Sequence, residues 1–282
     1  SKTKAIFVES VANPGGAITD LEAVAEVARK AKVPFIVDNT LATPYLLKPI
    51  EHGADIVVHS LTKFLGGHGN SLGGIIVDAG TFDWTASGRY PILTEPRPEY
   101  HGLKMHETFG NFAFAVAMRA LSLRDLGPAI SPFNSFMILT GIETLALRMQ
   151  RHVDNTKVVA EWLSQHPAVS WVSYASLPGD RHHNLARKYT PKGAGAVFTF
   201  GLQGGYEAGV SLVSNVKLFS HLANIGDTRS LIIHPASTTH SQLTDEQKTM
   251  AGAGPDVVRL SIGIEDKEDL IADLEQALNI PY

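Results

Sequence analysis

The sequence contains no cysteine among its 282 residues, and this absence excludes several kinds of site. Disulfide frameworks, thiol nucleophiles and thiolate metal centres all require cysteine. An excess of positive charge is missing too, because 24 lysines and arginines face 28 aspartates and glutamates, for a net charge of -4. A negative net charge offers no field that would attract nucleic acid or an acidic membrane, so we expect neither as a partner.

A long apolar run and a leader sequence are also lacking. No stretch approaches the roughly 20 apolar residues of a transmembrane helix, and no basic start precedes an apolar core, so we expect a cytoplasmic protein. The length is enough for one large or two ordinary globular domains. The chain opens without methionine and reaches a strand-like run almost at once. We therefore expect a longer native protein, whose upstream part is cut off, disordered or in another chain.

Strand-like and helix-like segments alternate along the first 80 residues. Between the first two strand-like runs, one helical face is followed by Pro34, and Thr19 and Glu22 before it have the spacing of a capping box. A short helix is expected over 43–54. Together these segments predict an α/β domain with parallel pairing. The expected buried strands are 4–10, 35–39, 55–60 and 73–80.

The middle of the chain changes character before a second domain begins. Segment 81–131 is aromatic, rich in proline and irregular, which is typical of a functional or disordered loop. A long helix over 131–167, bent near Gly141, would carry the chain from a domain of residues 1–146 to a smaller one of residues 147–282. In the smaller domain we expect strands at 169–175, 195–202 and 257–265, and helices near 205–222 and 266–278.

Polar side chains follow two of the expected strands where each strand ends. Asp38 ends one, Ser60 ends another, and Lys63 lies three residues further on. Ligands of such sheets bind at the carboxyl ends of the strands. A lysine amine forms a Schiff base with an aldehyde, and an aspartate can keep a pyridine nitrogen protonated. With the hydroxyls of Ser60 and Thr62 for a phosphate group, the set suits pyridoxal phosphate, although each residue alone could be a turn former, a cap or a solvated lysine.

Three competing motifs find little support. Residues 69–73, GNSLG, match the nucleophile elbow of serine hydrolases, but that motif needs a strand before it and a helix after it. The glycines in this segment also miss the dinucleotide-binding spacing. The twelve histidines contain no H-E-x-x-H pair, so we expect no metal site.

Five motifs in register make the chain resemble the Cys/Met-metabolism pyridoxal-phosphate enzymes of fold type I. They are ESVANPGG, IVDNTLATP, HSLTKFLGGHG, IGDTRSLIIHPASTTHSQ and VRLSIGIED. The resemblance covers the whole chain and implies a mostly parallel sheet with flanking helices, followed by a smaller C-terminal α/β domain, with the N-terminal part of the fold missing. It also implies a homodimer or homotetramer with sites between subunits.

The resemblance implies a role for each matching residue. Lys63 would carry pyridoxal 5'-phosphate and shuttle protons, Asp38 would pair with the pyridine nitrogen, and Ser60 and Thr62 would bind the phosphate. Asn13 would lie near the 3-oxygen of the cofactor. Arg259 and Asn224 would bind the carboxylate of the substrate.

The resemblance is strongest to the O-acetylhomoserine sulfhydrylase branch of this family. Segments PEYHGL and FGNFAF resemble its insertion, and Asn224 stands where the lyases typically have serine. The implied reaction converts O-acetyl-L-homoserine and sulfide, or methanethiol, to homocysteine, or methionine, and acetate. A succinyl ester, a cystathionine γ-synthase, a methionine γ-lyase and a non-catalytic fragment all remain open at this point.

Overall fold

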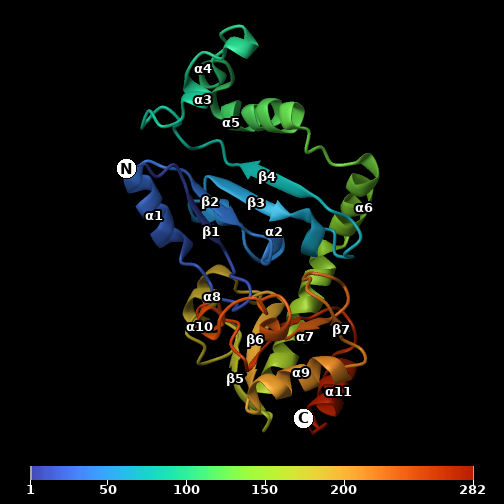
Figure 1. Ribbon diagram of the computed structural model, residues 1–282. Helices are drawn as coiled ribbons and strands as arrows, with labels where there is room; N and C mark the ends of the chain where they lie inside the picture. The colour runs from blue at the N-terminus through green and yellow to red at the C-terminus, as the bar shows by residue number, and fades with distance from the viewer. Residues whose placement is uncertain (1, 282) are drawn as a thin grey trace.

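Four short apolar strands build the first sheet of the protein in the computed structural model, which describes residues 2–281 (Figure 1). In order across the sheet they are β1 (Ile6–Glu9), β2 (Phe35–Asp38), β3 (Ile56–Ser60) and β4 (Gly74–Asp78). The first three run parallel, as the sequence predicts, and β4 runs antiparallel to β3. Only the short turn over Leu61–Leu65 and a glycine-rich loop separate β3 from β4, a connection that antiparallel neighbours allow.

Helices connect the parallel strands and begin at positions that differ slightly from prediction. Helix α1 (Leu21–Ala31) follows β1, and α2 (Thr43–Leu46) and η1 (Pro49–His52) follow β2. The predicted capping box at Thr19 is wrong. Asp20 is the N-cap of α1 and accepts from the Ala23 amide at 3.4 Å, whereas the Thr19 hydroxyl donates to the Glu9 carbonyl oxygen at 2.6 Å.

The aromatic segment after β4 is a layer of short helices rather than an irregular loop. Its aromatic rings pack on one another, with Trp84 stacked on Phe114 and edge-on to Tyr90. This cluster also covers Ile56 of β3, so the segment has a small core of its own against one face of the sheet. The helical turns are α3 (Pro91–Thr94), η3 (Pro98–Tyr100), α4 (Met105–Phe109), η4 (Gly110–Phe112), α5 (Ala113–Ala117) and η5 (Met118–Arg124).

Two consecutive helices carry the chain to the second half of the molecule (Figure 1). They are α6 (Pro132–Glu143) and α7 (Leu145–Gln165), and the bend between them falls at Thr144, three residues after the predicted one. Gly141 remains helical and allows close contact instead, because a β-carbon there would overlap the Gly66 carbonyl. The bend therefore lies near Gly141, as the sequence predicts, and its centre is Thr144.

The second sheet is mostly antiparallel and contains five strands in the order β5-β6-β9-β8-β7, of which only β7 and β8 pair in parallel. Strand β6 is buried along its whole length. The sequence did not predict β7 or β8, since two or three residues carry no readable periodicity. The strands are β5 (Val169–Ser173), β6 (Val197–Leu202), β7 (Ser220–His221), β8 (Leu231–Ile233) and β9 (Val257–Ser261).

Helices of the second half cover this sheet and contact the first half. Helix α11 (Lys267–Leu278) contacts both α7 and α9 (Gly205–Asn215), and α8 (His183–Tyr189) reaches α1. The Tyr189 hydroxyl donates to Asp20 at 2.5 Å and accepts from the Glu22 amide at 3.1 Å. One cluster of buried apolar residues contains members of both halves. The remaining elements are η6 (Pro235–Ser237) and α10 (Asp245–Met250).

Candidate active site

A small hollow of about 160 Å³ lies at the carboxyl ends of β1, β2 and β3. The last residues of the three strands, Glu9, Asp38 and Ser60, all line it, as parallel pairing requires. The second half of the chain closes it with Ile225. A larger hollow of about 510 Å³ lies beside α7 and α8, but the cations that line it are exposed surface side chains. The smaller hollow is therefore the better candidate, and its other lining residues are Val11, Asn13, Thr40, Leu41 and Lys63.

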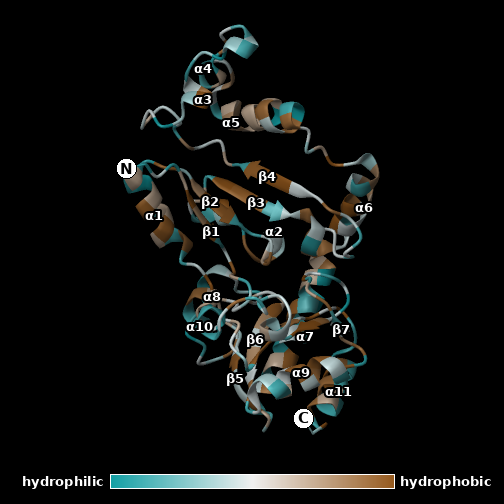
Figure 2. Ribbon diagram, in the orientation of Figure 1, coloured by the Kyte–Doolittle hydropathy of each residue, from teal (hydrophilic) through white to brown (hydrophobic). Residues whose placement is uncertain are grey.

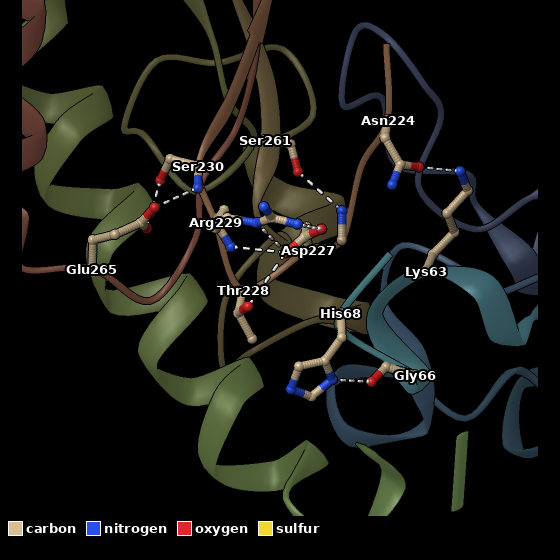
Figure 3. Close-up of polar contacts among 11 residues, drawn as sticks. Lys63, Gly66, His68, Asn224, Asp227, Thr228, Arg229, Ser230, Ser261 and Glu265 are labelled. Atoms are coloured by element: carbon tan, nitrogen blue, oxygen red, sulfur yellow. Dashed lines mark hydrogen bonds and ion pairs between the residues drawn. The ribbon is translucent and has the colours of Figure 1, made fainter. Parts of the chain in front are cut away.

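Lys63 enters this hollow from the π-helical turn η2 (Leu61–Leu65), which directly follows β3. The backbone leaves helical dihedral angles at Lys63, with φ -91° and ψ -132°. Such turns are frequent at functional sites. The Lys63 ammonium donates to Asn224 Oδ1, and Figure 3 shows the two side chains meeting end to end. Burial and, second, the nearby Arg259 cation lower the pKa of Lys63, which brings its neutral, nucleophilic form closer to physiological pH.

The glycines after Lys63 let neighbouring groups approach the turn closely. Gly67 has φ +77°, and a β-carbon there would overlap the Arg148 guanidinium. From the other side, Gly226 has φ +75°, and its added β-carbon would lie 2.6 Å from the Phe64 nitrogen. The Thr228 amide then donates to the Gly67 carbonyl at 2.8 Å. The glycine-rich sequence around Lys63 is thus explained by contacts on both sides of the lysine turn.

Asp38 and the hydroxyls lie on the sheet side of the hollow. Asp38 Oδ1 accepts from the Thr40 amide at 2.9 Å, and the Thr40 hydroxyl accepts from the Ser60 amide at 2.9 Å. The Thr40 hydroxyl proton is left for a further acceptor. Thr62 instead turns its hydroxyl to the backbone of Gly73, accepting from its amide at 3.1 Å. Sequence reasoning selected Thr62 and missed Thr40.

Arg259 of β9 lies across the hollow from the sheet and touches both predicted asparagines. One guanidinium nitrogen donates to Asn13 Oδ1 and another to the Asn224 carbonyl oxygen, each at 3.2 Å. Arg259 is half-buried, and burial lowers its pKa. An arginine remains charged in proteins, so it can receive an anionic group such as a carboxylate.

The segment that carries Asn224 is held by contacts that no local pattern indicated. The Gly226 amide donates to Ser261 Oγ at 3.1 Å, and the Ser230 amide and hydroxyl donate to Glu265 at 2.6 and 2.9 Å. Buried Asp227 accepts from the Arg229 amide at 3.1 Å. Figure 3 shows these contacts side by side with Lys63. Ser261 and Glu265 lie 35 positions from their partners Gly226 and Ser230, which is why only the structure reveals those contacts.

The side chains that meet in the hollow suit a lysine-bound aldehyde cofactor. An amine with a lowered pKa, a carboxylate at a strand end and hydroxyls line it, and an arginine from the second half of the chain binds Asn13 at its edge. Within residues 2–281 no three histidine, aspartate or glutamate side chains gather as metal ligands would. In the same residues no helix has the length and apolar character needed to cross a membrane.

Comparison with known proteins identifies the class that this fold and site define. The chain belongs to the family of Cys/Met metabolism PLP-dependent enzymes, whose model matches residues 1–279. It is 55% identical to O-acetyl-L-homoserine sulfhydrylase 1 of Thermus thermophilus over 98% of the chain and 66% of that protein. It is 51% identical to homocysteine synthase of Schizosaccharomyces pombe over 99% of the chain and 65% of that protein.

One solved structure of a similar protein has nearly the same fold as this chain. The putative O-acetylhomoserine (thiol)-lyase of Campylobacter jejuni, which contains N'-pyridoxyl-lysine-5'-monophosphate, superimposes with a TM-score of 0.94 at 43% identity. The match covers 99% of this chain and 66% of that one. The chain therefore spans about two thirds of the length of these relatives, and it shares their fold throughout that part.

Proposed function

We propose that this chain is the catalytic part of an O-acetylhomoserine sulfhydrylase. The observation that carries the proposal is that Lys63 and Asp38 line one hollow while Arg259, from the second sheet, binds Asn13 at its edge and the backbone of Asn224. Relatives that are 51–55% identical over nearly the whole chain are named for this activity or for homocysteine synthesis. The reaction would convert O-acetyl-L-homoserine and sulfide to L-homocysteine and acetate, with methanethiol as the acceptor that would give methionine.

Three side chains at the hollow would have direct tasks in that reaction. Pyridoxal phosphate, when bound, supplies an aldehyde carbon and an electron-withdrawing ring. Lys63 would hold it through Nζ and would take and return protons as the general base. Asp38 would keep the ring nitrogen protonated. Arg259 would bind the substrate carboxylate, because its fork of N–H donors matches two carboxylate oxygens.

The smaller polar groups would position the two ligands. Asn224 would keep Lys63 Nζ at the hollow and Asn13 would support Arg259, since Asn224 binds the Lys63 ammonium and Asn13 binds the Arg259 guanidinium. Ser60 and Thr62 are proposed for the phosphate group. The Thr62 hydroxyl would have to exchange its contact with Gly73 for that purpose, whereas Thr40 already lines the hollow.

We further propose that the enzyme works as a homodimer or homotetramer. Helix α6 exposes Phe133 and Phe136, with 71% and 63% of their surface accessible, and Leu139 one turn further on. Figure 2 shows apolar residues along α6 and along β4. Exposed apolar patches of this kind mark interaction surfaces. A second copy seated on α6 would lie close to the lysine turn, because α6 contacts η2.

Trapping the cofactor on Lys63 tests the proposal directly. The full protein would be mixed with pyridoxal phosphate, reduced with borohydride and digested, and the peptides would be mapped by mass spectrometry. We expect a pyridoxyl group on Lys63, none in Lys63→Met, and an unchanged result in Lys192→Met, which alters an exposed lysine far along the chain. Modification spread over surface lysines, without preference for Lys63, would contradict the assignment.

Product analysis then separates the related reactions. With O-acetylhomoserine and sulfide we expect homocysteine and acetate. Cystathionine formed from cysteine would indicate a γ-synthase, and a keto acid formed without any thiol would indicate a γ-lyase. Replacing the acetyl ester by the succinyl ester decides which leaving group the enzyme accepts.

A further inference from the structure

The lysine turn is held from behind by a buried arginine, Arg148, in the first part of α7. Only 6% of Arg148 is accessible. Its guanidinium donates to the carbonyl oxygens of Phe64 at 2.7 Å and Leu65 at 3.2 Å, the two residues that follow Lys63. One planar fork thus binds the backbone of the turn directly beside the lysine.

The same guanidinium also secures the bend between α6 and α7. Arg148 donates to the carbonyl oxygen of Gly141 at 2.7 Å and to the hydroxyl of Thr144 at 3.1 Å. These two residues are the end of α6 and the bend itself. Arg148 therefore joins three pieces of backbone: the lysine turn, the end of α6 and the start of α7.

Two glycines make this arrangement possible. A β-carbon on Gly67 would overlap the Arg148 guanidinium, and a β-carbon on Gly141 would overlap the Gly66 carbonyl. The chain thus leaves room for the guanidinium on one side and brings α6 directly against the lysine turn on the other. A side chain that only filled the space of Arg148 would not require glycine at both positions.

Moving a charged guanidinium out of water costs free energy, so a buried arginine needs a reason to be there. The contacts described for Arg148 go to carbonyl and hydroxyl oxygens, and burial lowers the pKa of Arg148. An apolar side chain of similar volume is often as stabilising as a buried charge or more so. An apolar side chain could not bind three carbonyl groups at once. The charged guanidinium therefore fixes the positions of these carbonyl groups relative to one another.

We propose that Arg148 is a positioning residue that sets the direction of Lys63 by locking the η2 turn to the α6–α7 bend. It reaches neither the hollow nor Lys63 Nζ and acts only through the backbone of residues 64 and 65. Without it the turn can relax, and Lys63 Nζ moves away from Asn224 and Arg259. The inference deepens the proposed function, since it concerns the lysine assigned there as the base.

The position of Lys63 can be read without any cofactor, from its pKa. Burial and the Arg259 cation lower that pKa, so a lysine that leaves the hollow regains a higher value. The full protein, without added pyridoxal phosphate, would be labelled with trace acetic anhydride at a series of pH values. Mass spectrometry of the Lys63 peptide then gives the pH midpoint of its reactivity. This readout is independent of the reaction that the enzyme catalyses.

The variants are chosen to separate positioning from stability. Arg148→Met should move the Lys63 midpoint to higher pH, and Arg148→Lys should move it less, because an ammonium keeps the charge but lacks the planar fork that reaches all three carbonyl oxygens. Arg151→Met is the matched control, since Arg151 also lies on α7 and also donates to backbone carbonyls, at Ile264 and Glu265. It should leave the Lys63 midpoint unchanged.

Activity provides the second readout. In Arg148→Met we expect kcat to fall by about 10- to 100-fold, the size of a small misplacement of a reacting group, with KM little changed because Arg259 is intact. A folded Arg148→Met protein with the wild-type Lys63 midpoint would overturn the inference. If Arg148→Met does not fold, a folded Arg148→Lys protein with the wild-type Lys63 midpoint would overturn the inference instead. Failure of the sulfhydrylase assay in the wild type would refute the proposed function but leave the labelling result interpretable.

Discussion

Single residues in the hollow have surroundings that suit the chemistry proposed for them. Lys63 is half-buried beside a cation, and both effects lower its pKa. A lowered pKa in the folded state means that the unfolded chain binds this proton more tightly, so folding is penalised at pH values where lysine is protonated. The residue proposed as the reactive amine is therefore also expected to make the fold less stable.

Lys63→Met tests that cost at the level of the fold. At pH 7 we expect the variant to have a higher free energy of unfolding than the wild type, because the penalty for the protonated lysine is gone. The difference should shrink as the pH rises toward 10.5, the ordinary value for lysine, since the wild-type penalty disappears there. Urea denaturation at pH 7 and pH 10 measures both values. If the difference in unfolding free energy between variant and wild type is equal at the two pH values, the surroundings of Lys63 do not lower its pKa.

Arg259→Lys tests the carboxylate contact. An ammonium cannot bind two carboxylate oxygens as a guanidinium does, so KM for the amino-acid substrate should rise by about tenfold or more, which corresponds to roughly 1.5 kcal/mol for a lost charged hydrogen bond. The value of kcat should change less. Arg229→Lys is the control, because Arg229 is an exposed arginine that pairs with Asp227. Steady-state kinetics at saturating sulfide give the comparison.

At this scale the sequence predicts the residues at strand ends best. Asp38, Ser60 and Lys63 follow from the alternation of strands, because parallel pairing brings their ends together. Thr40 was missed because a hydroxyl two residues after a strand carries no distinctive pattern. Arg148 was missed because its contacts join residues 84 and 83 positions apart, and local sequence does not encode them.

Whole elements follow the predicted order, but their ends depend on contacts that the sequence does not display. Helix α1 begins after Asp20 rather than after Thr19, because the Thr19 hydroxyl is bound to the end of β1. The capping box that does exist, Thr244 with Gln247, begins α10 in a region where no helix was predicted. Strand β9 ends at Ser261, four residues earlier than predicted, and the chain then turns to bind Ala196, Thr228 and Ser230.

Helix α7 offers a prediction about acid stability. His152, one turn after Arg148, packs edge-on to Phe64 and shares a hydrogen bond of 2.6 Å with the Ile262 carbonyl. Burial is the main cause that lowers its pKa from 6.5 to about 4. The unfolded chain therefore takes up a proton between pH 6.5 and 4 that the folded protein refuses, so stability should fall as the pH drops through that range, by on the order of 3 kcal/mol.

His152→Gln isolates this effect from the rest of the protein. At pH 7 the variant should be less stable than the wild type, because the ring contact with Phe64 is lost. As the pH falls to 4 the difference should narrow, since glutamine has no proton to take up. Unfolding by urea at pH 7, 5.5 and 4 measures the trend. A difference that stays constant over this range would show that folding does not shift the pKa of His152.

The molecule as a whole is two sheets with one shared core and a site at their junction. The apolar cluster extends through both halves, and Tyr189 and Lys188 of α8 bind Asp20 and Glu22 at the start of α1. Each half contributes a part of the hollow that the other lacks. Sequence reasoning reached this arrangement only through the family resemblance, because periodicity predicts elements but not how two sheets face each other.

The largest-scale prediction concerns the exposed side of α6. Phe133 and Phe136 lie one turn apart, and exposing two large aromatic rings to water is unfavourable unless another surface covers them. The double change Phe133→Ser and Phe136→Ser should therefore shift the protein toward a smaller species in light scattering at micromolar concentration. Met250→Ser, at an equally exposed position in the second half, should leave the mass unchanged. Because α6 contacts the lysine turn through Gly141 and Gly66, loss of the second copy should also lower activity. A wild-type protein that is already monomeric would show that α6 faces something other than a second copy.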